Sequence, residues 1–216
     1  MSRVEHEPRP GTIGPELAEE FPRLGLRQLR IAARPRRSPP GVREVLRHLS
    51  SRISGAQVVH LRQRPIPAAY RVFFRHIGID PDKQLPPAEQ VAMQRLHDGH
   101  FRSRNVIADA VTIAVIETGV PVRVVDGART QGELGLRLSR AGERLGGAHL
   151  ATGTMVVADE AGPVSELFAE ARRGHAIARK TREIVVYAVQ VGGVPDIAVD
   201  EALWQVAELA GSSSDS

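Results

Sequence analysis

The side chains that could do chemistry in this chain are few, and their types exclude several mechanisms. The 216 residues include no cysteine, which excludes thiolate nucleophiles, disulfides and cysteine-ligated zinc. The sequence has no Gly-x-Ser-x-Gly serine elbow and no His-Glu-x-x-His zinc pair. Its two lysines, Lys83 and Lys180, do not follow a glycine-rich phosphate loop. The sequence therefore predicts no cofactor and assigns no catalytic nucleophile.

His97 and His100 are the one pair with the spacing of metal ligands. Residues three apart share a helix face, so both imidazoles would meet if a helix ran through them. Gly99 is expected to end the helix there, and no third ligand lies nearby in the sequence. A solvated helix end, where the helix dipole favours histidine, is the preferred interpretation, and no metal site is predicted.

Arginine supplies nearly all of the positive charge, and the formal net charge is +4. The planar guanidinium suits phosphate, and a basic balance favours nucleic acid. A GC-rich genome would enrich arginine equally well, so only the placement of the arginines decides between these explanations. The candidate RNA-contacting residues are Arg172, Arg173, Arg179, Lys180 and Arg182. The alternative is an ordinary solvated charged surface.

Apolar periodicity predicts the elements that must position these residues. Helical spacing indicates helices over 42–53, 69–77, 86–97 and 106–117. The last of these is apolar on nearly all sides, so it is expected to be central in the core. A short strand is expected over 25–33, before the helices.

Beyond Gly119 the apolar period changes to two, which is typical of strands. Strands are expected over 122–125, 135–138, 154–157 and 184–191, with a final amphipathic helix over 200–209. N-terminal helices followed by a strand-rich half predict an α+β fold.

Composition suggests one domain over 15–209 between disordered tails at 1–14 and 210–216. No apolar run approaches the roughly 20 residues that cross a bilayer, and the first residues lack the apolar stretch of a signal peptide. The expected location is therefore the cytoplasm, with no membrane partner.

Four segments occur in an order and spacing that together form a pattern over 69–190. The third, from Glu117 to Asp126, matches Glu-x-Gly-x-Pro-x-His-x-x-Asp at five of six fixed positions. The full set is 69–81 with 87–89, 105–109, 117–126, and 132–137 with 141–143, followed by Thr181 and 184–187. This pattern resembles the B3/B4 domain, the tRNA-editing module in the beta subunit of phenylalanyl-tRNA synthetase, and most of all its free-standing relatives.

In the synthetase this module hydrolyses tyrosine wrongly attached to the phenylalanine tRNA. The resemblance therefore implies a B3/B4-like fold, a tRNA or aminoacyl-tRNA partner, and ester hydrolysis in trans at the 3′ end of tRNA. The substrate-binding positions that it implies are Thr112, Arg123, Thr181 and Tyr187. The framework positions that it implies are Arg71, Asp109, Gly119, Pro121 and Asp126.

The chain departs from the family pattern at three positions. Arg123 stands where the family has histidine, Thr112 replaces an asparagine, and Tyr187 aligns with the glutamate that reads the tyrosine hydroxyl. Tyrosine recognition is therefore not carried over, and any surviving amino-acid pocket has a different specificity.

Individual residues leave alternatives open. Arg123 suits a clamp on phosphate or carboxylate, but also a surface position on an alternating strand. Asp126 suits a turn better than a catalytic base, and Glu143 suits a solvated turn. Asp109 is expected to accept hydrogen bonds from backbone or from Arg71, because a buried charge needs a partner. Thr112 suits either a substrate contact or a bond to its own helix.

Three functions remain open at this stage. The first is an aminoacyl-tRNA deacylase acting in trans. The second is a non-catalytic RNA-binding or protein-interaction module that kept the fold. The third is an enzyme for small aminoacyl esters or amides. The retained Gly119-Val-Pro121 loop and Thr181 favour the first, and the departures favour the second.

Overall fold

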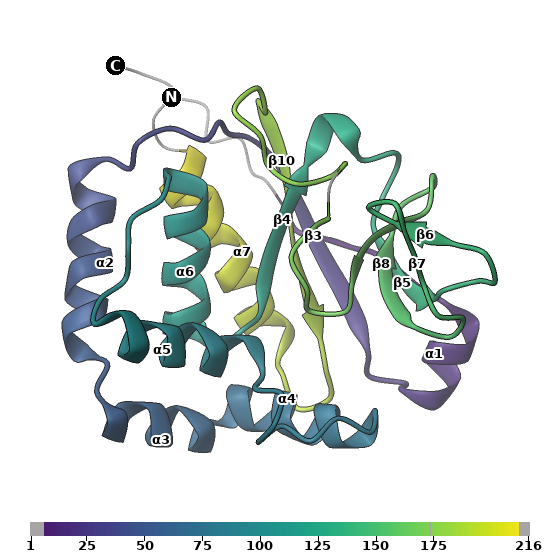
Figure 1. Ribbon diagram of the computed structural model, residues 1–216, viewed down its shortest axis with the longest axis horizontal. Coiled ribbons are helices and arrows are strands. Elements are labelled where there is room, and N and C mark those ends of the chain that lie inside the picture. The colour runs from purple at the N-terminus through teal and green to yellow at the C-terminus, as the bar shows by residue number, and fades with distance from the viewer. Residues whose placement is uncertain (1–6, 173, 212–216) are drawn as a thin grey trace. The chain divides into compact units, whose positions relative to one another are not determined.

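A computed structural model describes residues 7–172 and 174–211 of the chain (Figure 1). The chain divides into two compact units. The first unit is formed by Met1–Pro35 with Arg123–Gln190, and the second by Arg36–Val122 with Val191–Ser216. The single domain expected over 15–209 thus spans both units, each of which combines two stretches that are distant in the sequence.

One sheet of the first unit is built around β3 and β10. Its order is β1-β3-β10-β4, with β1 at Arg9–Pro10, β3 at Gly25–Ala32, β10 at Glu183–Gln190 and β4 at Val122–Asp126. β3 and β10 pair antiparallel along their full lengths, from Gly25 opposite Gln190 to Ala32 opposite Glu183. The interior of β10 is buried, as expected for a continuous run of β-branched residues.

A second sheet of the same unit has the order β2-β5-β8-β9. β2 is Thr12–Ile13, β5 Gly135–Leu138, β8 Met155–Ala158 and β9 Pro163–Glu166. β2 runs parallel to β5, whereas β5, β8 and β9 pair antiparallel. The remaining elements of this unit are α1 at Pro15–Glu20, the 3-10 helix η1 at Gly127–Arg129, and the short pair β6 at Arg144–Leu145 and β7 at Ala148–His149.

The segment before Gly14 does not behave as the sequence predicts. A disordered tail is expected up to residue 14, yet residues 9–13 contribute one strand to each of the two four-stranded sheets. The backbone N–H of Gly11, between these strands, donates to the Leu26 carbonyl at 2.7 Å. A Cβ at Gly11 would lie 2.3 Å from the Leu134 carbonyl oxygen, so only glycine fits this crossing.

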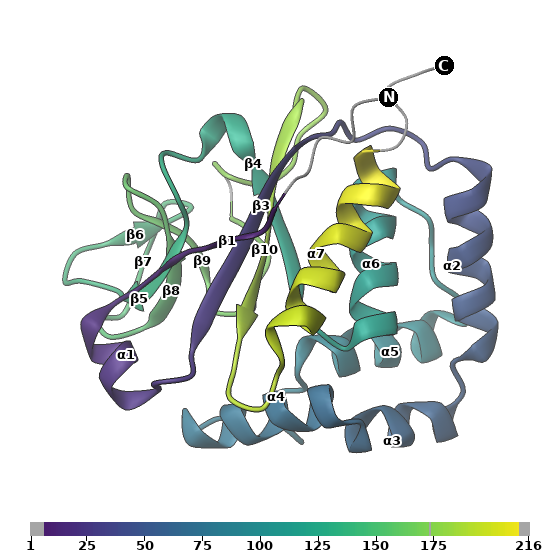
Figure 2. The ribbon, with the colours of Figure 1, turned by 180° about the vertical axis from the view of Figure 1, so that it is seen from behind.

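The second unit is helical. Its helices are α2 at Pro40–Arg52, α3 at Gly55–Gln63, α4 at Pro65–His76, α5 at Pro87–Asp98, α6 at Val106–Thr118 and α7 at Asp196–Gly211. α6 packs against α2, α5 and α7. Figures 1 and 2 both draw α6 between α2 and α7. The prediction that this apolar helix is central is therefore confirmed.

Both ends of α6 follow from local sequence. Asn105 caps its first turn by accepting a hydrogen bond from the Ala108 N–H at 3.1 Å. Gly119 ends it at φ 79°, a left-handed conformation in which a side chain would also meet Pro67 at 2.9 Å. This sharp end turns the chain towards β4.

The fold is mixed, with helices and several sheets, in agreement with the predicted α+β class. The strand expected before the helices is confirmed as β3, but two short strands, β1 and β2, and the helix α1 precede it and were not predicted. β1 pairs with β3, whereas β2 and β3 pair with strands more than a hundred residues later. Within the described ranges, no helix combines the length and apolarity needed to cross a bilayer.

Candidate functional site

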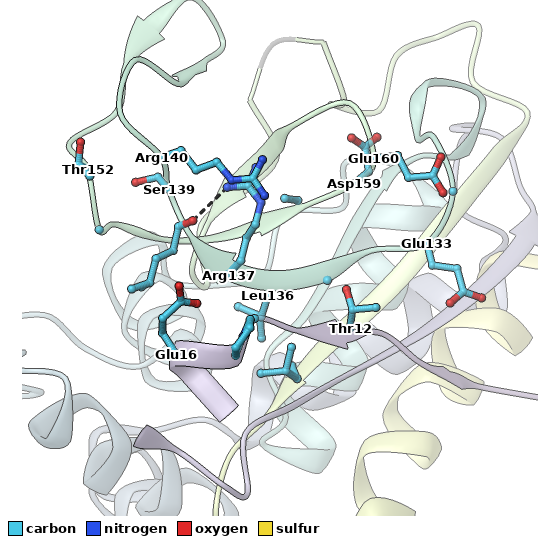
Figure 3. A pocket seen from close by; sticks show the side chains of 18 residues that line it. Thr12, Glu16, Glu133, Leu136, Arg137, Ser139, Arg140, Thr152, Asp159 and Glu160 are labelled. Atoms are coloured by element: carbon cyan, nitrogen blue, oxygen red, sulfur yellow. Dashed lines mark hydrogen bonds between the residues drawn. The ribbon is translucent and has the colours of Figure 1, made fainter. Parts of the chain in front are cut away.

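A cavity of about 1060 Å³ opens in the first unit, beside the sheet formed by β2, β5 and β8. Its wall includes the first turn of α1, strand β5 and the turns at either end of β8. Figure 3 shows Glu133, Asp159 and Glu160 on one side of it, and Arg137 and Arg140 with Ser139, Thr152 and Glu16 on the other. A cavity of this size and mixed lining is typical of ligand sites.

The basic side is organised by a bidentate ion pair. Nη1 and Nη2 of Arg137 donate to the two carboxylate oxygens of Glu143 at 2.8 and 2.6 Å, and the Arg140 N–H also donates to Glu143 at 2.8 Å. These bonds from Arg137 hold the pKa of the Glu143 carboxyl below its usual range, and the pair raises the pKa of Arg137. Glu143 is therefore not the simple solvated turn residue that the sequence suggests.

Arg140 differs from Arg137 in having an exposed side chain. Among the described residues, only its backbone takes part in hydrogen bonds, both of them with Glu143. The Arg137–Glu143 pair thus fixes the turn from which the Arg140 guanidinium extends, and that guanidinium keeps its donors for a ligand.

The acidic side is organised by Asp159. Its carboxylate accepts hydrogen bonds from the backbone N–H groups of Gln131 at 2.8 Å, Ala161 at 2.9 Å and Gly162 at 3.1 Å. Asp159 is thus committed to holding the turn after β8. The adjacent Glu160 and the facing Glu133 are exposed, and their carboxylates are the groups on this side that can meet a cation.

The hydroxyl of Ser139 has no role as an activated nucleophile. Its Oγ donates to the Ala151 carbonyl at 2.6 Å and accepts from the Thr154 N–H at 3.0 Å. Both interactions position the loop between β5 and β8, and neither partner is a general base.

Thr181 and Asp126, which both belong to the sequence pattern, are in direct contact. The Thr181 hydroxyl donates to Asp126 Oδ2 at 2.7 Å and accepts from the Ala178 N–H at 3.0 Å. Asp126 also caps η1 through the Ala128 N–H at 3.1 Å. Both side chains are buried, and together they join the end of β4 to the start of β10 across 55 positions.

Tyr187 lies in the interior of the first unit, on β10. Its hydroxyl is 2.9 Å from Ser165 Oγ on β9, and both residues are buried. Burial raises the pKa of the Tyr187 phenol, while the Ser165 hydrogen bond and the Arg123 charge act in the opposite direction. The phenol is therefore neutral and already has a protein partner.

Arg123 holds the loop after β9. Its Nε and Nη2 both donate to the Phe168 carbonyl, at 3.0 and 2.7 Å. Phe168 has φ 58°, an uncommon conformation for a residue with a side chain. Burial lowers the pKa of the Arg123 guanidinium, and Tyr187 and Glu170 partly offset this effect. Arg123 thus stabilises an unusual backbone conformation.

The remaining implied substrate residue, Thr112, belongs to the second unit. It is half-buried on α6, and its hydroxyl donates to the Ala108 carbonyl one turn earlier at 2.9 Å. Of the four implied substrate residues, none is among the described residues that line the cavity. Arg123 and Tyr187 interact electrostatically, whereas Thr181 pairs with Asp126.

The candidate RNA-contacting residues lie in the segment between β9 and β10. Arg172, Arg179, Lys180 and Arg182 are exposed there. Arg172 donates to the Glu166 carboxylate at 3.3 Å, and Arg182 donates to the carbonyls of Arg179 and Thr181. Arg173 lies outside the described residues.

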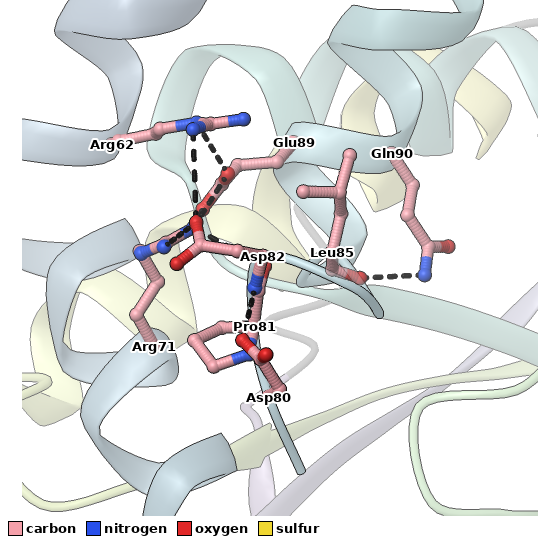
Figure 4. Close-up of polar contacts among 8 residues, drawn as sticks. All are labelled: Arg62, Arg71, Asp80, Pro81, Asp82, Leu85, Glu89 and Gln90. Atoms are coloured by element: carbon pink, nitrogen blue, oxygen red, sulfur yellow. Dashed lines mark hydrogen bonds and ion pairs between the residues drawn. The ribbon is translucent and has the colours of Figure 1, made fainter.

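Arg71 belongs to a buried ion-pair network in the second unit (Figure 4). It donates to both oxygens of Glu89, at 3.1 and 2.9 Å, and to Asp82 at 2.5 Å. Arg62 Nε lies 2.9 Å from Glu89 without the alignment of a hydrogen bond. Glu89 is completely buried, so two arginines neutralise one buried carboxylate and connect α3, α4 and α5.

Asp109 does not pair with Arg71. Its carboxylate accepts from the hydroxyls of Ser38 and Ser103, both at 2.5 Å, and from the Arg104 N–H at 2.9 Å. The buried charge is therefore satisfied by residues of two loops, the one before α2 and the one before α6. Pro121, like Gly119, is buried at the junction of α6 and β4.

Sequence reasoning missed four exposed charged residues that line the cavity: Glu16, Glu133, Arg140 and Glu160. Glu133 lies inside a matched segment, but periodicity gives no sign that it faces Arg140 across a cavity. In the parts of the chain that the structure describes, no group of three histidine, aspartate or glutamate side chains is arranged to hold a metal ion. No protein-family model matches this chain, and no curated protein sequence matches it at a significant level.

Proposed function

We propose that this chain is a B3/B4-like cytoplasmic module that binds aminoacyl-tRNA and hydrolyses the aminoacyl ester in trans. The proposal rests on the sequence pattern over 69–190 and on the cavity of the first unit. The cavity carries the argument for chemistry, because it offers both signs of charge to one ligand. An aminoacyl ester at the end of a tRNA has the matching charges, an α-ammonium group and nearby phosphates.

The Asp126–Thr181 contact supports the family part of the proposal. The resemblance selects these two residues from segments 55 positions apart, and they form a buried hydrogen bond of 2.7 Å. If the match to the family were accidental, two of its positions so far apart in the sequence would not be expected to bond each other in the structure. The junction at Gly119 supports it too, since its left-handed conformation requires the glycine of the pattern.

The substrate fits the cavity in one orientation. The carboxylates of Glu133 and Glu160 attract the α-ammonium group, and the Arg140 guanidinium binds a phosphate near the 3′ end of the tRNA. The ester then lies between the two sides, near the β5 backbone. Specificity for the amino acid follows from the space beside β2 and the start of α1, not from Tyr187, whose hydroxyl bonds Ser165.

The reaction needs no protein nucleophile. A water oxygen attacks the ester carbonyl carbon, and the tetrahedral intermediate collapses with cleavage of the bond to the ribose oxygen. That oxygen takes up a proton, which leaves a free amino acid and a tRNA with a free hydroxyl. Aminoacyl esters are already labile, so binding that orients the water and the ester suffices for catalysis. A carboxylate of the acidic side, Glu133 or Glu160, serves as the base for the water.

The test is release of amino acid from a panel of correctly and incorrectly charged tRNAs by the purified protein. Cleavage of at least one ester well above the buffer rate is expected, with a loss of at least tenfold for Glu160→Gln and Arg140→Gln. Glu19→Gln, which changes an exposed carboxylate on α1, is the matched control and should retain activity. If no ester is cleaved, the hydrolase proposal fails, and tRNA binding without cleavage would indicate a non-catalytic RNA-binding module.

A further inference from the structure

Two arginine-rich loops meet beside α2 in the second unit. One loop enters α2 and carries Arg36 and Arg37, and the other leads from α5 into α6 and carries Arg102 and Arg104. The Val106 N–H donates to the Arg36 carbonyl at 2.9 Å, which joins the two loops directly. With Arg43 and Arg47 of α2, these six residues form what is called here the arginine surface.

The buried side chain of Asp109 holds both loops in place through hydrogen bonds. Its buried carboxylate binds Ser38 in the first loop and Ser103 with Arg104 in the second. The donors to the Asp109 carboxylate are neutral hydroxyl and amide groups, so this carboxylate does not form ion pairs with the nearby arginine side chains. The loops are held in place while the guanidinium groups stay available, which lowers the conformational cost of binding a ligand.

A cavity of about 420 Å³ lies within this surface. Arg43 and Arg47 line it from α2, and His100, Phe101 and Ser103 line it from the second loop. The Nε of Arg43 is buried and has no hydrogen-bond partner. Such an unpaired donor is costly in the interior, and an oxygen ligand in the cavity would satisfy it.

Positive charge is in large excess in the two stretches of chain that form the arginine surface. The stretches 36–52 and 95–105 together contain eight arginines but only two acidic residues, Glu44 and Asp98. Glu44 pairs with Arg47, and Asp98 bonds His97 and also interacts electrostatically with Arg102. Among the described residues, no acidic side chain lies within ion-pair distance of Arg36, Arg37, Arg43, Arg102 or Arg104. A surface with so many uncompensated guanidinium groups suits a polyanion.

We infer that the arginine surface binds the phosphate backbone of RNA. The choice of RNA among polyanions rests on the proposed function, whereas the surface itself is independent of the ester-cleaving cavity. Guanidinium groups from two loops and from α2 contact successive phosphates. The half-buried ring of Phe101, which lines the same cavity, offers a face on which one unpaired base stacks.

The decisive experiment measures binding of a fluorescent single-stranded RNA of about 20 nucleotides by anisotropy over a range of KCl concentrations. The variant Arg37→Gln/Arg104→Gln removes one exposed guanidinium from each loop. Arg23→Gln/Arg75→Gln is the control, because it removes the same charge from exposed positions outside the surface. Neither pair takes part in a hydrogen bond through its side chains among the described residues, so all variants are expected to fold.

Each phosphate contact contributes about 0.7 to the slope of log affinity against log salt for single strands, and about fivefold in affinity near 0.1 M salt. The surface variant should therefore lose about 1.4 in slope and roughly 25-fold in affinity. The control should lose less than about threefold, as expected for net charge alone. Equal losses in the two variants, or an unchanged slope in the surface variant, would overturn the inference.

Measuring ester cleavage by the same variants separates a failure of this inference from a failure of the proposed function. An aminoacyl ester of a single nucleotide lacks the run of successive phosphates that the arginine surface binds, so the surface variant should cleave it at the wild-type rate while losing activity on intact charged tRNA. If the small ester is cleaved but no RNA binds, the inference is wrong and the proposed function stands. If RNA binds through the surface and no ester of any size is cleaved, only the hydrolase proposal is wrong.

Discussion

Replacing Thr181 by valine tests the contact that joins two parts of the sequence pattern. Valine has nearly the same shape as threonine but no hydroxyl. The substitution removes the 2.7 Å hydrogen bond to Asp126 Oδ2 and the 3.0 Å bond from the Ala178 N–H. It leaves a buried carboxylate oxygen without its nearest donor.

The expected cost follows from these two bonds. A hydrogen bond to a charged group is worth about 1.5–3 kcal/mol, and the loss of a second, partly exposed one adds roughly 0.5–1 kcal/mol. The free energy of unfolding should therefore fall by about 2–4 kcal/mol, a large part of the roughly 5–15 kcal/mol that stabilises a typical domain.

Thr112→Val is the matched control. Within the described ranges, the Thr112 hydroxyl donates only to the Ala108 carbonyl of its own helix, and valine is tolerated there at a cost of less than about 1 kcal/mol. Urea unfolding followed by circular dichroism gives both free energies. Hydrogen exchange by mass spectrometry should show faster exchange in β10 for Thr181→Val alone. The reasoning is refuted if both substitutions cost the same, or if Thr181→Val costs less than about 0.5 kcal/mol.

Three further predictions concern the charged groups. Glu89→Gln leaves Arg71 and Arg62 without their buried counter-charge, so the free energy of unfolding measured in urea should fall by about 3–5 kcal/mol. The control, Glu183→Gln, changes an exposed pair with Arg30 and should lower it by less than about 1 kcal/mol. Similar losses in the two variants would contradict this prediction. The pKa of Glu143 is lowered by Arg137, so its stabilising effect is present above the unfolded pKa of about 4.3 and disappears as pH falls through the lower folded value. The stability difference between wild type and Glu143→Gln should therefore shrink from pH 6 to pH 3, and a Glu143 pKa above about 4.3 by NMR would disprove the pairing. Arg123→Ala should speed amide exchange over 166–171, because two guanidinium donors hold the Phe168 carbonyl; unchanged exchange would show that the loop does not depend on Arg123.

Periodicity predicted the elements whose burial is set by local sequence. α6 is apolar on nearly all sides and lies at the centre of its unit, and β10 is a β-branched run in the middle of a sheet. Gly99 and Gly119 were predictable as helix ends, because both occupy the left-handed conformation that glycine tolerates best. In each case the residues within one element decide the outcome.

Local patterns failed where a partner lies far along the chain. β1 and β2 are two residues long, so their own sequence has no period, and they exist because β3 and β5 offer unpaired edges. The buried Glu89 looks like an ordinary first-turn helix residue until Arg62 and Arg71 are seen to converge on it. Asp109 was expected to bond backbone or Arg71. It does accept a hydrogen bond from the Arg104 N–H, but its other partners are Ser38 and Ser103, and Ser38 lies 71 residues away in the sequence.

The sequence by itself determined the class of fold, most of the helices and strands, the exclusion of cysteine chemistry, and a pattern that resembles the B3/B4 family. These properties depend on residue type and on short-range spacing, which a single sequence records directly. Only the tertiary structure decided that Thr181 bonds Asp126, that Tyr187 bonds Ser165, and that free charges of opposite sign face one cavity. Those contacts join residues that are tens of positions apart, and the free energy that selects them comes from simultaneous burial and hydrogen bonding, which no local pattern contains.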